Sequence, residues 1–438
     1  MTKTNIKSIY FTFACLFILT KANAQDLLTV EEAVAIALDN NYQILIASNN
    51  LKIDETGVSL GFAGMLPTVN GTVSDNRSLI DLEQVRNDGS QVSQDNAKNN
   101  TFSYGARLDW TIFDGFGMFA RYDQLKEVEK LGEAELQQAI VDRVSQVMIT
   151  YYDLVQQQQQ LTALDSTMVI SQQRVELSNN RFTIGKASKL EVLNAQVDLN
   201  TDQTLQMRQK ELYTNTKILL NELLARDSKT DFKVVDAILV DNGLDLSQLE
   251  SLAMQLNPQL QAQLINKRIA EIQLKQVKAN RLPVLGINAG YSRSESESSL
   301  GFAVSSVSQG WNYGFTASIN IFDGFNQNRN EKIAKIQIEN SQIAIKQQEQ
   351  QLATQLATAY QTYLTNISLV ELEAGNVDIA KENLDITLDK YRIGTIPTIE
   401  FRTAQLNYIN AEVRYSNAMF QAKLSEITLK QLAGSLTL

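Results

Sequence analysis

Strict alternation of apolar and polar residues marks one segment in each half of the chain. Between residues 102 and 112 every even-numbered position is apolar or aromatic, and the odd-numbered positions carry Ser, Gly, Arg, Asp and Thr. Between residues 311 and 321 the same alternation returns, with the apolar side chains at odd-numbered positions. Alternation over about ten residues predicts strands with one apolar face, as transmembrane β-strands have. Weaker partner strands are expected near residues 69–73 and 285–291.

The apolar face of these strands is expected to contact lipid, because aromatic residues near strand ends are typical of the membrane interface. The candidate lipid-facing residues are Tyr104, Trp110, Trp311, Tyr313 and Phe315. A half-buried strand of a soluble sandwich would alternate in the same way. The polar segments 77–101 and 294–309 favour the membrane strand, because they are expected to be long outward loops of a barrel.

Apolar residues also recur every seven positions, in two stretches of about seventy residues without proline. The first series is Ile140, Val147, Leu154, Leu161, Met168, Val175 and Phe182, and the second lies 209 residues further along. A sustained seven-residue period predicts long helices that pack as coiled coils. Each helix would reach roughly 100 Å, which is too long to be buried within one chain. The five glutamines at 156–160 are expected to form an exposed or lumen-facing turn of the first long helix.

The chain contains an internal duplication. Residues 112–116 and 321–325 both read IFDGF and lie 209 positions apart, and Gly185 and Gly394 have the same spacing. Upstream, Pro67 and Pro283 are 216 positions apart, so an insertion or deletion falls in the loop between the two strands of a half. Each half therefore predicts the order helix, strand, strand, long helix, glycine turn and helix. The first helical patterns of the halves cover about 29–64 and 245–281.

These patterns predict a mainly α-helical fold with membrane β-strands. Its expected parts are a signal peptide at 1–24, a first repeat at 25–226, a linker or equatorial segment at 227–243, and a second repeat at 244–438. Two strands per half cannot close a useful barrel, and a bilayer does not tolerate open sheet edges. Several copies must therefore share one barrel. A trimer would supply twelve strands, and its long helices would form a tube.

The first residues have the layout of a secretory signal peptide. Lys3 and Lys7 precede an apolar run at 9–19, and Ala-Asn-Ala at 22–24 predicts cleavage after Ala24. The alternative, an N-terminal anchor helix, would need a longer apolar run. Cys15 is the single cysteine of the chain and lies inside the segment to be removed, so no lipid anchor is expected.

The amino-acid composition excludes most of the common catalytic mechanisms. The chain has no histidine, so a Ser-His or Cys-His nucleophile and the commonest metal ligand are excluded. No enzyme activity, metal or cofactor is expected. The formal net charge of −10 becomes −13 once Lys3, Lys7 and Lys21 leave with the signal peptide. That charge disfavours nucleic acid or anionic lipid as a main partner.

The chain resembles the TolC-like outer-membrane efflux proteins along essentially all of its mature length. The resemblance rests on the duplicated plan, the Leu-Pro steps at 66–67 and 282–283, both IFDGF motifs, and the sequences FTIGKASKLEVLNAQ and YRIGTIPTIEFRTAQ. It implies a homotrimer with a twelve-stranded barrel in the outer membrane of a Gram-negative bacterium, and a helical tube in the periplasm. It also implies a passive exit duct of a tripartite efflux or type I secretion system. A periplasmic adaptor protein would connect this duct to an inner-membrane pump of the resistance-nodulation-division or ABC type.

The resemblance places the two glycine turns at the periplasmic tips, where the adaptor would dock. The candidate docking residues are Gly185, Lys186, Ala187, Gly394, Thr395 and Ile396. Glu191 and Glu400 match acidic positions that line the closed aperture in the family, and in a trimer they would form carboxylate rings that favour cations. The alternative is that both are ordinary solvated helix residues.

Tyr391 matches the tyrosine of the family's gate, which makes it a third candidate for the aperture. The gate's arginine position holds Ile396 here, and its second aspartate position holds Thr403. Arg392 and Arg402 are near these positions but out of register. The resemblance therefore implies a constriction at the tip without that particular set of hydrogen bonds.

A competing hypothesis is a trimeric autotransporter-type surface adhesin, which would also contribute four strands per chain and coiled-coil segments. In such a protein the strands are consecutive and C-terminal. Here the strand pairs are separated by helical segments, and the chain ends on a helical pattern. The order of the elements favours the export duct.

Overall fold

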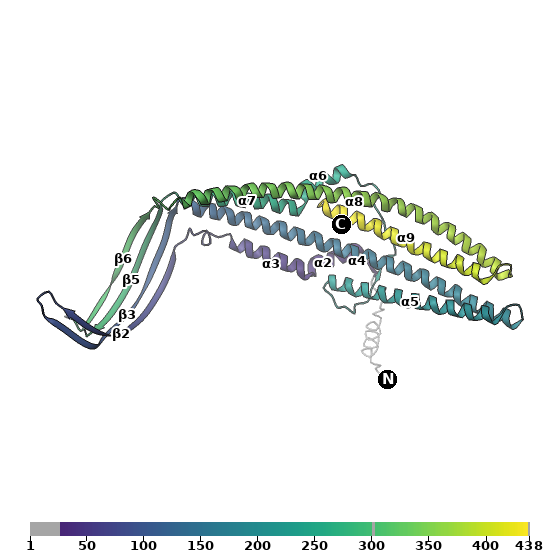
Figure 1. Ribbon diagram of the computed structural model, residues 1–438, viewed down its shortest axis with the longest axis horizontal. Helices are drawn as coiled ribbons and strands as arrows, with labels where there is room; N and C mark the ends of the chain where they lie inside the picture. The colour runs from purple at the N-terminus through teal and green to yellow at the C-terminus, as the bar shows by residue number, and fades with distance from the viewer. Residues whose placement is uncertain (1–26, 300–302, 437–438) are drawn as a thin grey trace, which may run out of the picture. The chain divides into compact units, whose positions relative to one another are not determined.

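A computed structural model describes residues 27–299 and 303–436 (Figure 1). The expected signal peptide and Cys15 lie outside the described residues. The chain divides into two compact units. The first contains the described residues up to 45 together with 139–257 and 352–436, and the second contains 46–138 and 258–351.

The two halves of the chain repeat one order of elements. The first half consists of α2 (Val30–Asn40), α3 (Tyr42–Gly57), β2 (Thr68–Val85), β3 (Gln91–Asp114), α4 (Gly117–Thr183) and α5 (Lys189–Leu223). The second half consists of α6 (Leu246–Leu256), α7 (Pro258–Ala279), β5 (Val284–Ser298), β6 (Ser305–Ser318), α8 (Asn326–Ile393) and α9 (Thr398–Leu432). Two short strands, β1 (Leu27–Leu28) and β4 (Lys233–Val234), pair in parallel. The long helices predicted from the seven-residue period are thus present, with 67 residues in α4 and 68 in α8.

The four longer strands form one antiparallel sheet in the order β2-β3-β5-β6. Both hairpins have the same register from Thr68–Asp109 to Ile80–Ala97, because Val284 lies opposite Ser318 in the second, which are shifts of 216 and 209 residues. The pairing gathers one apolar face from all four strands. That face carries Val69, Val73, Tyr104, Leu108, Trp110, Leu285, Ile287, Tyr291, Trp311, Tyr313, Phe315 and Ala317.

The polar segments differ from the prediction. Residues 77–85 and 91–101 were expected in a loop, but they continue β2 and β3, and only a short turn at 86–90 joins the two strands. An antiparallel ladder is built from main-chain groups, so polar side chains on both faces do not prevent it. In the second half, β5 continues to Ser298 for the same reason. The strand predicted at 311–321 ends earlier, because β6 stops at Ser318.

Each IFDGF motif forms a tight elbow from strand to long helix. Gly115 and Phe116 have φ values of 71° and 69°, and Gly324 and Phe325 have 67° and 63°. The preceding aspartate caps the new helix. The Asp114 carboxylate accepts a hydrogen bond from the Met118 backbone N–H at 2.8 Å, and the equivalent carboxylate in the second half accepts one at 2.7 Å. The identical pentapeptides therefore encode identical turns.

The first helical pattern of each half is broken where a single helix was expected. Asn41 separates α2 from α3, and Asn257 separates α6 from α7. The Asn41 side-chain amide donates to the Leu223 carbonyl at 2.8 Å, and the Asn257 amide donates to the Leu432 carbonyl at 3.0 Å. Each break thus satisfies a carbonyl at the C-terminal end of the last helix of its own half, where intrahelical partners run out.

The core of the first unit lies where the segment 227–243, which joins the two halves and is called the joint below, packs against the helices. Phe232, Val234 and Ile238 of the joint are buried in a cluster with residues of α2, α4, α5 and α9. The Tyr151 hydroxyl donates to the Leu28 carbonyl at 2.8 Å and accepts from the backbone N–H of Val235 at 3.1 Å, so one side chain holds both β1 and the joint. Across the described residues, no helix combines the length and the apolar character needed to cross a membrane.

Candidate functional site

Two glycine turns join the antiparallel helices of the first unit, α4 to α5 and α8 to α9. Gly185 has φ 73° and Gly394 has φ 83°, which is the left-handed region that glycine adopts without strain. In both turns a backbone N–H returns to the preceding helix, from Lys186 to the Arg181 carbonyl at 2.7 Å and from Thr395 to the Lys390 carbonyl at 3.0 Å. These bonds satisfy carbonyls that have no partner within the helix.

The predicted docking residues around these turns differ in exposure. Lys186 and Thr395 are exposed, and Ala187 is half-buried. Ile396 is half-buried because it packs against a small apolar cluster that includes Tyr391 and Phe401. The tips also expose large apolar side chains, because Ile184 is 65% exposed and Ile393 is 76% exposed.

Two of the three aperture candidates meet in the structure. The Tyr391 hydroxyl donates to the Glu191 carboxylate at 3.3 Å and lies 3.1 Å from the Ser178 hydroxyl. The Tyr391 ring stacks on Phe401 with 5.1 Å between the centroids, and the Arg181 guanidinium lies 4.6 Å from its centre. Tyr391 therefore joins the second tip to α4 and α5. Glu400 is exposed in the first turn of α9 and takes no part in these contacts.

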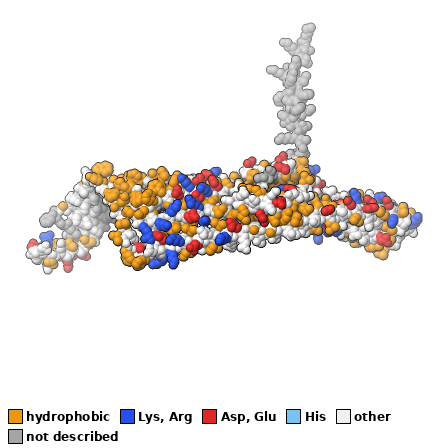
Figure 2. All heavy atoms as spheres, turned by 90° about the horizontal axis from the view of Figure 1, so that it is seen from above, with side chains coloured by type: hydrophobic (Ala, Val, Ile, Leu, Met, Phe, Trp, Pro, Cys, Tyr) orange, Lys and Arg blue, Asp and Glu red, His pale blue; other side chains and the backbone are white. Residues whose placement is uncertain are grey.

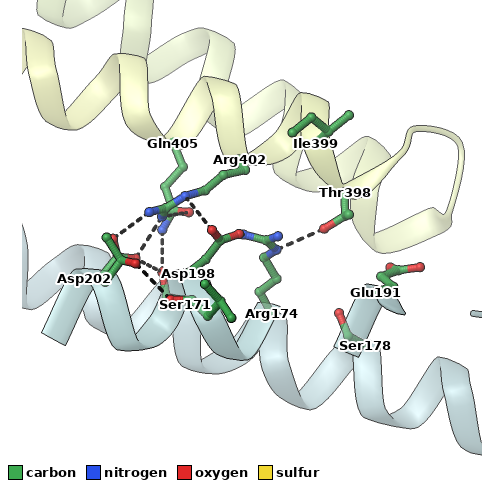
Figure 3. A network of polar contacts seen from close by, with 12 residues as sticks. Ser171, Arg174, Ser178, Glu191, Asp198, Asp202, Thr398, Ile399, Arg402 and Gln405 are labelled. Atoms are coloured by element: carbon green, nitrogen blue, oxygen red, sulfur yellow. Dashed lines mark hydrogen bonds and ion pairs between the residues drawn. The ribbon is translucent and has the colours of Figure 1, made fainter. Parts of the chain in front are cut away.

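Deeper in the same bundle lies a buried ionic network centred on Arg402 of α9 (Figure 3). Its guanidinium binds both carboxylate oxygens of Asp202 on α5, each at 2.8 Å, and lies 3.8 Å from a carboxylate oxygen of Asp198. The Ser171 hydroxyl of α4 donates to Asp202 at 2.6 Å, and the Gln405 amide donates to Ser171 at 2.9 Å. Three helices from both halves of the chain therefore share one closed set of polar contacts.

Arg174 of α4 forms the second centre of the network. It contacts a carboxylate oxygen of Asp198 at 2.7 Å and donates to the Thr398 hydroxyl at the start of α9 at 3.0 Å. The network thus balances two arginines against two aspartates. Removing one partner of such a buried pair typically costs about 3–5 kcal/mol, because the other charge is left uncompensated.

The interface between the two helical hairpins combines buried polar contacts with an apolar cluster, in which Ile170 and Leu177 of α4 pack against Tyr391 and Phe401. Val175 packs on Ala195 and Leu199 inside the first hairpin, and Tyr391 packs on Phe401 inside the second. Between the hairpins, α4 presents the buried polar residues Thr167, Ser171, Arg174 and Ser178. The seam between the two hairpins is therefore held by hydrogen bonds and ion pairs together with this apolar packing.

Sequence reasoning missed this seam, although the signal was readable. Thr167, Arg174 and Arg181 recur every seven residues, and so do Ser171 and Ser178. The apolar series has the same seven-residue period. The recurrence of these polar residues therefore indicated that they pack against neighbouring helices. The same oversight affected residues 156–160. Gln156 is buried and its amide contacts Asn417, so the prediction of an exposed or lumen-facing turn is wrong at that residue.

Comparison with known sequences decides the family. The sequence model of the outer membrane efflux protein family matches residues 33–226 and 249–435, which covers most of both halves. The chain belongs to this family. Membership confirms the resemblance to TolC-like proteins and places the protein in the outer membrane of a Gram-negative cell, with its helices extending into the periplasm. The family consists of channels rather than enzymes.

Individual relatives of this efflux protein are distant in sequence. The proteases secretion protein PrtF of Dickeya chrysanthemi is 18% identical over 415 residues, which are 92% of this chain and 88% of that protein. The outer membrane channel CmeC of Campylobacter jejuni has a TM-score of 0.76 at 17% identity, covering 93% of this chain and 85% of that one. VceC of Vibrio cholerae has a TM-score of 0.73 at 14% identity, covering 92% and 96%. At these identities the solved structures show a shared fold.

Proposed function

We propose that the protein is the outer-membrane exit duct of a tripartite export system, which passively conducts substrates delivered by a periplasmic adaptor and an inner-membrane pump. The observation that carries this proposal is the four-stranded sheet, which has one apolar face and whose outer strands β2 and β6 each have one edge without a partner strand among the described residues. Open edges are not tolerated in lipid. Three copies would close a barrel of twelve strands, with Tyr104, Trp110, Trp311, Tyr313 and Phe315 facing lipid.

In this duct, residues 25–226 and 244–438 act as two equivalent efflux repeats, and 227–243 forms the equatorial joint. The likeness to PrtF, whose name refers to protease secretion, supports a type I secretion system driven by an ABC pump. The likeness to CmeC, described as an outer membrane channel, supports a duct of the same architecture. A pump of the resistance-nodulation-division type is the second candidate, because the matched family is that of efflux proteins.

The tips form the periplasmic aperture and the adaptor docking site. Tyr391 and Glu191 join the second hairpin to the first, and the Arg402 network continues that link along the seam. With these contacts in place the hairpins stay together and the aperture is narrow. The exposed Lys186 and Thr395 contact the adaptor, and Glu400 supplies a carboxylate to the aperture.

The test of the duct is oligomeric state followed by transport. In detergent, light scattering should give the mass of three chains, and a monodisperse monomer would refute the shared barrel. In planar bilayers the trimer should conduct ions, and Asp202→Asn should raise its conductance several-fold, because the variant weakens the seam. Thr201→Ala, at a position of α5 that is exposed and whose equivalent Asn410 is also exposed, is the matched control and should leave the conductance unchanged. Deletion of the gene should abolish export of the substrate of the pump encoded beside it.

A further inference from the structure

The two elbows between strand and long helix differ on the side of the sheet that is apolar. In the first half, Trp110 lies on the apolar face, and its indole N–H donates to the Met65 carbonyl oxygen at 2.9 Å. The segment that leads into the strand pair therefore lies on the apolar side of the sheet. The equivalents of these two residues are Ile319, at a shift of 209, and Arg281, at a shift of 216. Isoleucine is smaller than tryptophan and has no side-chain donor, so the second elbow lacks this closing contact.

A hollow of about 1090 Å³ lies at the second elbow. Its apolar lining includes Ile319, Ile321, Phe322 and Phe325, which are all exposed. Ile319 and Ile321 continue the alternation of β6, so this lining is continuous with the apolar face of the sheet. Arg281 lies in the polar part of the lining. The hollow thus has an apolar part beside the sheet and a cationic part beside the helices.

Arg281 keeps donors available at the polar end of the hollow. Its guanidinium donates to the Glu331 carboxylate and, at 2.6 Å, to the Asn328 side-chain oxygen. These contacts use two of the five N–H donors of a guanidinium, and the side chain is 49% exposed. The hydrogen bond from Arg281 is the main cause that lowers the pKa of the Glu331 carboxyl, and the charge of Lys278 adds to it. One carboxylate therefore faces two cations, and the polar end carries a net positive charge.

Basic side chains are concentrated around this elbow. The last turns of α7, the residues that follow it and the first turns of α8 carry six exposed basic residues and one acidic residue, Glu331. The basic residues are Lys275, Lys278, Arg281, Arg329, Lys332 and Lys335. Their equivalents in the first half are Ser59, Phe62, Met65, Ala120, Asp123 and Lys126. In Figure 2, hydrophobic side chains gather where the helices adjoin the strands, and Lys and Arg side chains lie next to them on the helices. Because the chain as a whole has a formal net charge of −10, this positive charge is a local feature of the second elbow.

We infer that this hollow, called the second-elbow pocket, binds one anionic phospholipid of the periplasmic leaflet. The headgroup phosphate contacts Arg281 and Lys278, and an acyl chain lies along Ile319 and Phe322. The inference rests on the proposed function in one respect, which is the placement of the sheet in the membrane. Arg281 and Lys278 precede β5 by only three and six residues, so they lie beside the headgroup layer, which extends roughly 5–8 Å beyond the hydrocarbon core.

The two kinds of lining favour a phospholipid over a soluble anion. A guanidinium and an ammonium group form charge-assisted hydrogen bonds with phosphate, and basic side chains beside a membrane attract anionic headgroups. A soluble phosphate would leave the aliphatic and aromatic lining in water, whereas an acyl chain covers it and continues onto the apolar face of the sheet. The first elbow differs in both respects, because Phe62 and Met65 replace the two cations and Trp110 replaces Ile319. One site per chain is therefore expected.

Native mass spectrometry of the detergent-solubilised protein tests the charges. The protein is titrated with phosphatidylglycerol or with phosphatidylcholine, and the lipids retained per chain are counted. The wild type should retain one phosphatidylglycerol per chain with an affinity at least about ten-fold above that for phosphatidylcholine. Lys278→Gln with Arg281→Gln should remove this preference. Lys267→Gln with Arg268→Gln, which makes the same change of charge further from the elbow on α7, is the matched control and should keep it.

Ile319→Trp tests the hollow itself, because it gives the second elbow the indole that closes the first. The variant leaves every charge in place, so a purely electrostatic attraction of lipid would be unchanged. We expect the retention of phosphatidylglycerol to fall to the level of phosphatidylcholine. Retention as in the wild type would show that lipid does not enter the hollow and would overturn the inference.

Further outcomes distinguish the occupants and separate this inference from the proposed function. Inorganic phosphate in excess should not displace the lipid, and displacement would show a site for a free anion. Equal retention by the wild type and the Lys278 and Arg281 variant would also overturn the inference, as expected if a second copy of the chain covers this surface. Light scattering gives the oligomeric state independently. A monomer that retains phosphatidylglycerol would refute the shared barrel and support the pocket, whereas a trimer without the lipid preference would refute the pocket alone.

Discussion

The two helical hairpins of the first unit share a backbone plan, but equivalent side chains have opposite surroundings. Arg402 of α9 is 6% exposed, whereas its equivalent Leu193 of α5 is 52% exposed. Tyr391 of α8 is 1% exposed, whereas its equivalent Phe182 of α4 is 42% exposed. Within the chain, the face of the second hairpin that contains Tyr391 and Arg402 is buried against the first hairpin. The equivalent face of the first hairpin, which contains Phe182 and Leu193, is exposed.

This difference shows how a duplicated chain acquires a specialised contact. The turns, caps and helix lengths are set locally and are the same in both halves. The ionic network belongs to the single interface between hairpins within the chain, so only Arg402, and not Leu193, needs a charge. Equivalent positions therefore provide matched controls, and four measurements test the contrast.

The largest effect is expected at Arg402. Arg402→Ala leaves Asp202 buried without its bidentate partner and should lower the free energy of unfolding by about 3–5 kcal/mol. Leu193→Ala should lower it much less, because Leu193 has no buried ion pair to lose. Thermal unfolding of the detergent-solubilised protein, followed by circular dichroism, measures both. Equal losses of unfolding free energy in the two variants would show that Arg402 and Leu193 do not differ in their contribution to stability.

The next effect is expected at Tyr391. Tyr391→Ala removes a buried ring stacked on Phe401 and should cost about 3 kcal/mol, whereas Phe182→Ala should cost much less. Tyr391→Phe keeps the ring and loses the contacts with Ser178 and Glu191, so it should cost about 1 kcal/mol. The same unfolding assay ranks the three variants. If Tyr391→Phe were as damaging as Tyr391→Ala, the hydroxyl would matter more than the stacking.

Alkaline pH should distinguish the halves at Tyr152, whose equivalent Gln361 cannot ionise. Burial raises the pKa of Tyr152 to about 12, and the Glu426 carboxylate adds to the shift. The folded state thus favours the neutral phenol, so its contribution is complete below pH 10 and is lost as the pH rises from about 10 to 12. The loss amounts to about 2–3 kcal/mol. In the Tyr152→Phe variant, the free energy of unfolding should fall less between about pH 10 and 12 than in the wild type. The same fall in both proteins would show that Tyr152 is not the group that ionises.

The smallest effect concerns the ends of α5 and α9. Ala225 has φ 51°, and its equivalent Gly434 has φ 68°. Ala225→Gly should relieve a left-handed alanine and raise stability by about 1 kcal/mol. Gly434→Ala should lower stability by more than that, because its Cβ would lie 2.7 Å from the Leu256 carbonyl group. Melting temperatures that move in the same direction for both variants would contradict this account.

Local signals in the sequence were sufficient for most of the fold. The alternation at 102–112, the IFDGF elbows and the glycine turns each act within a few residues, and the structure contains all three. The strands at 77–101 were not predicted, because their few apolar residues, such as Leu79, Ile80 and Val85, do not alternate regularly with the polar residues around them. The early end of β6 was not predictable from side-chain alternation, because a strand also needs a partner strand.

The candidate site was predicted only in part for a different reason. The turn geometry at Gly185 and Gly394 follows from glycine itself, and Tyr391 was identified by its place in the repeat. Arg402 and Asp202 are 200 residues apart, and in the sequence each looks like a solvated charge on a helix. Only the folded chain shows that they meet.

The two free edges of the sheet also have a genetic consequence. In the proposed trimer, each copy must provide an intact β2 to one neighbour and an intact β6 to the other before the barrel can close. A subunit damaged at one edge still joins a normal subunit through its intact edge and then leaves that assembly open. Such alleles should be dominant over the wild-type gene, unlike alleles that prevent the chain from being made.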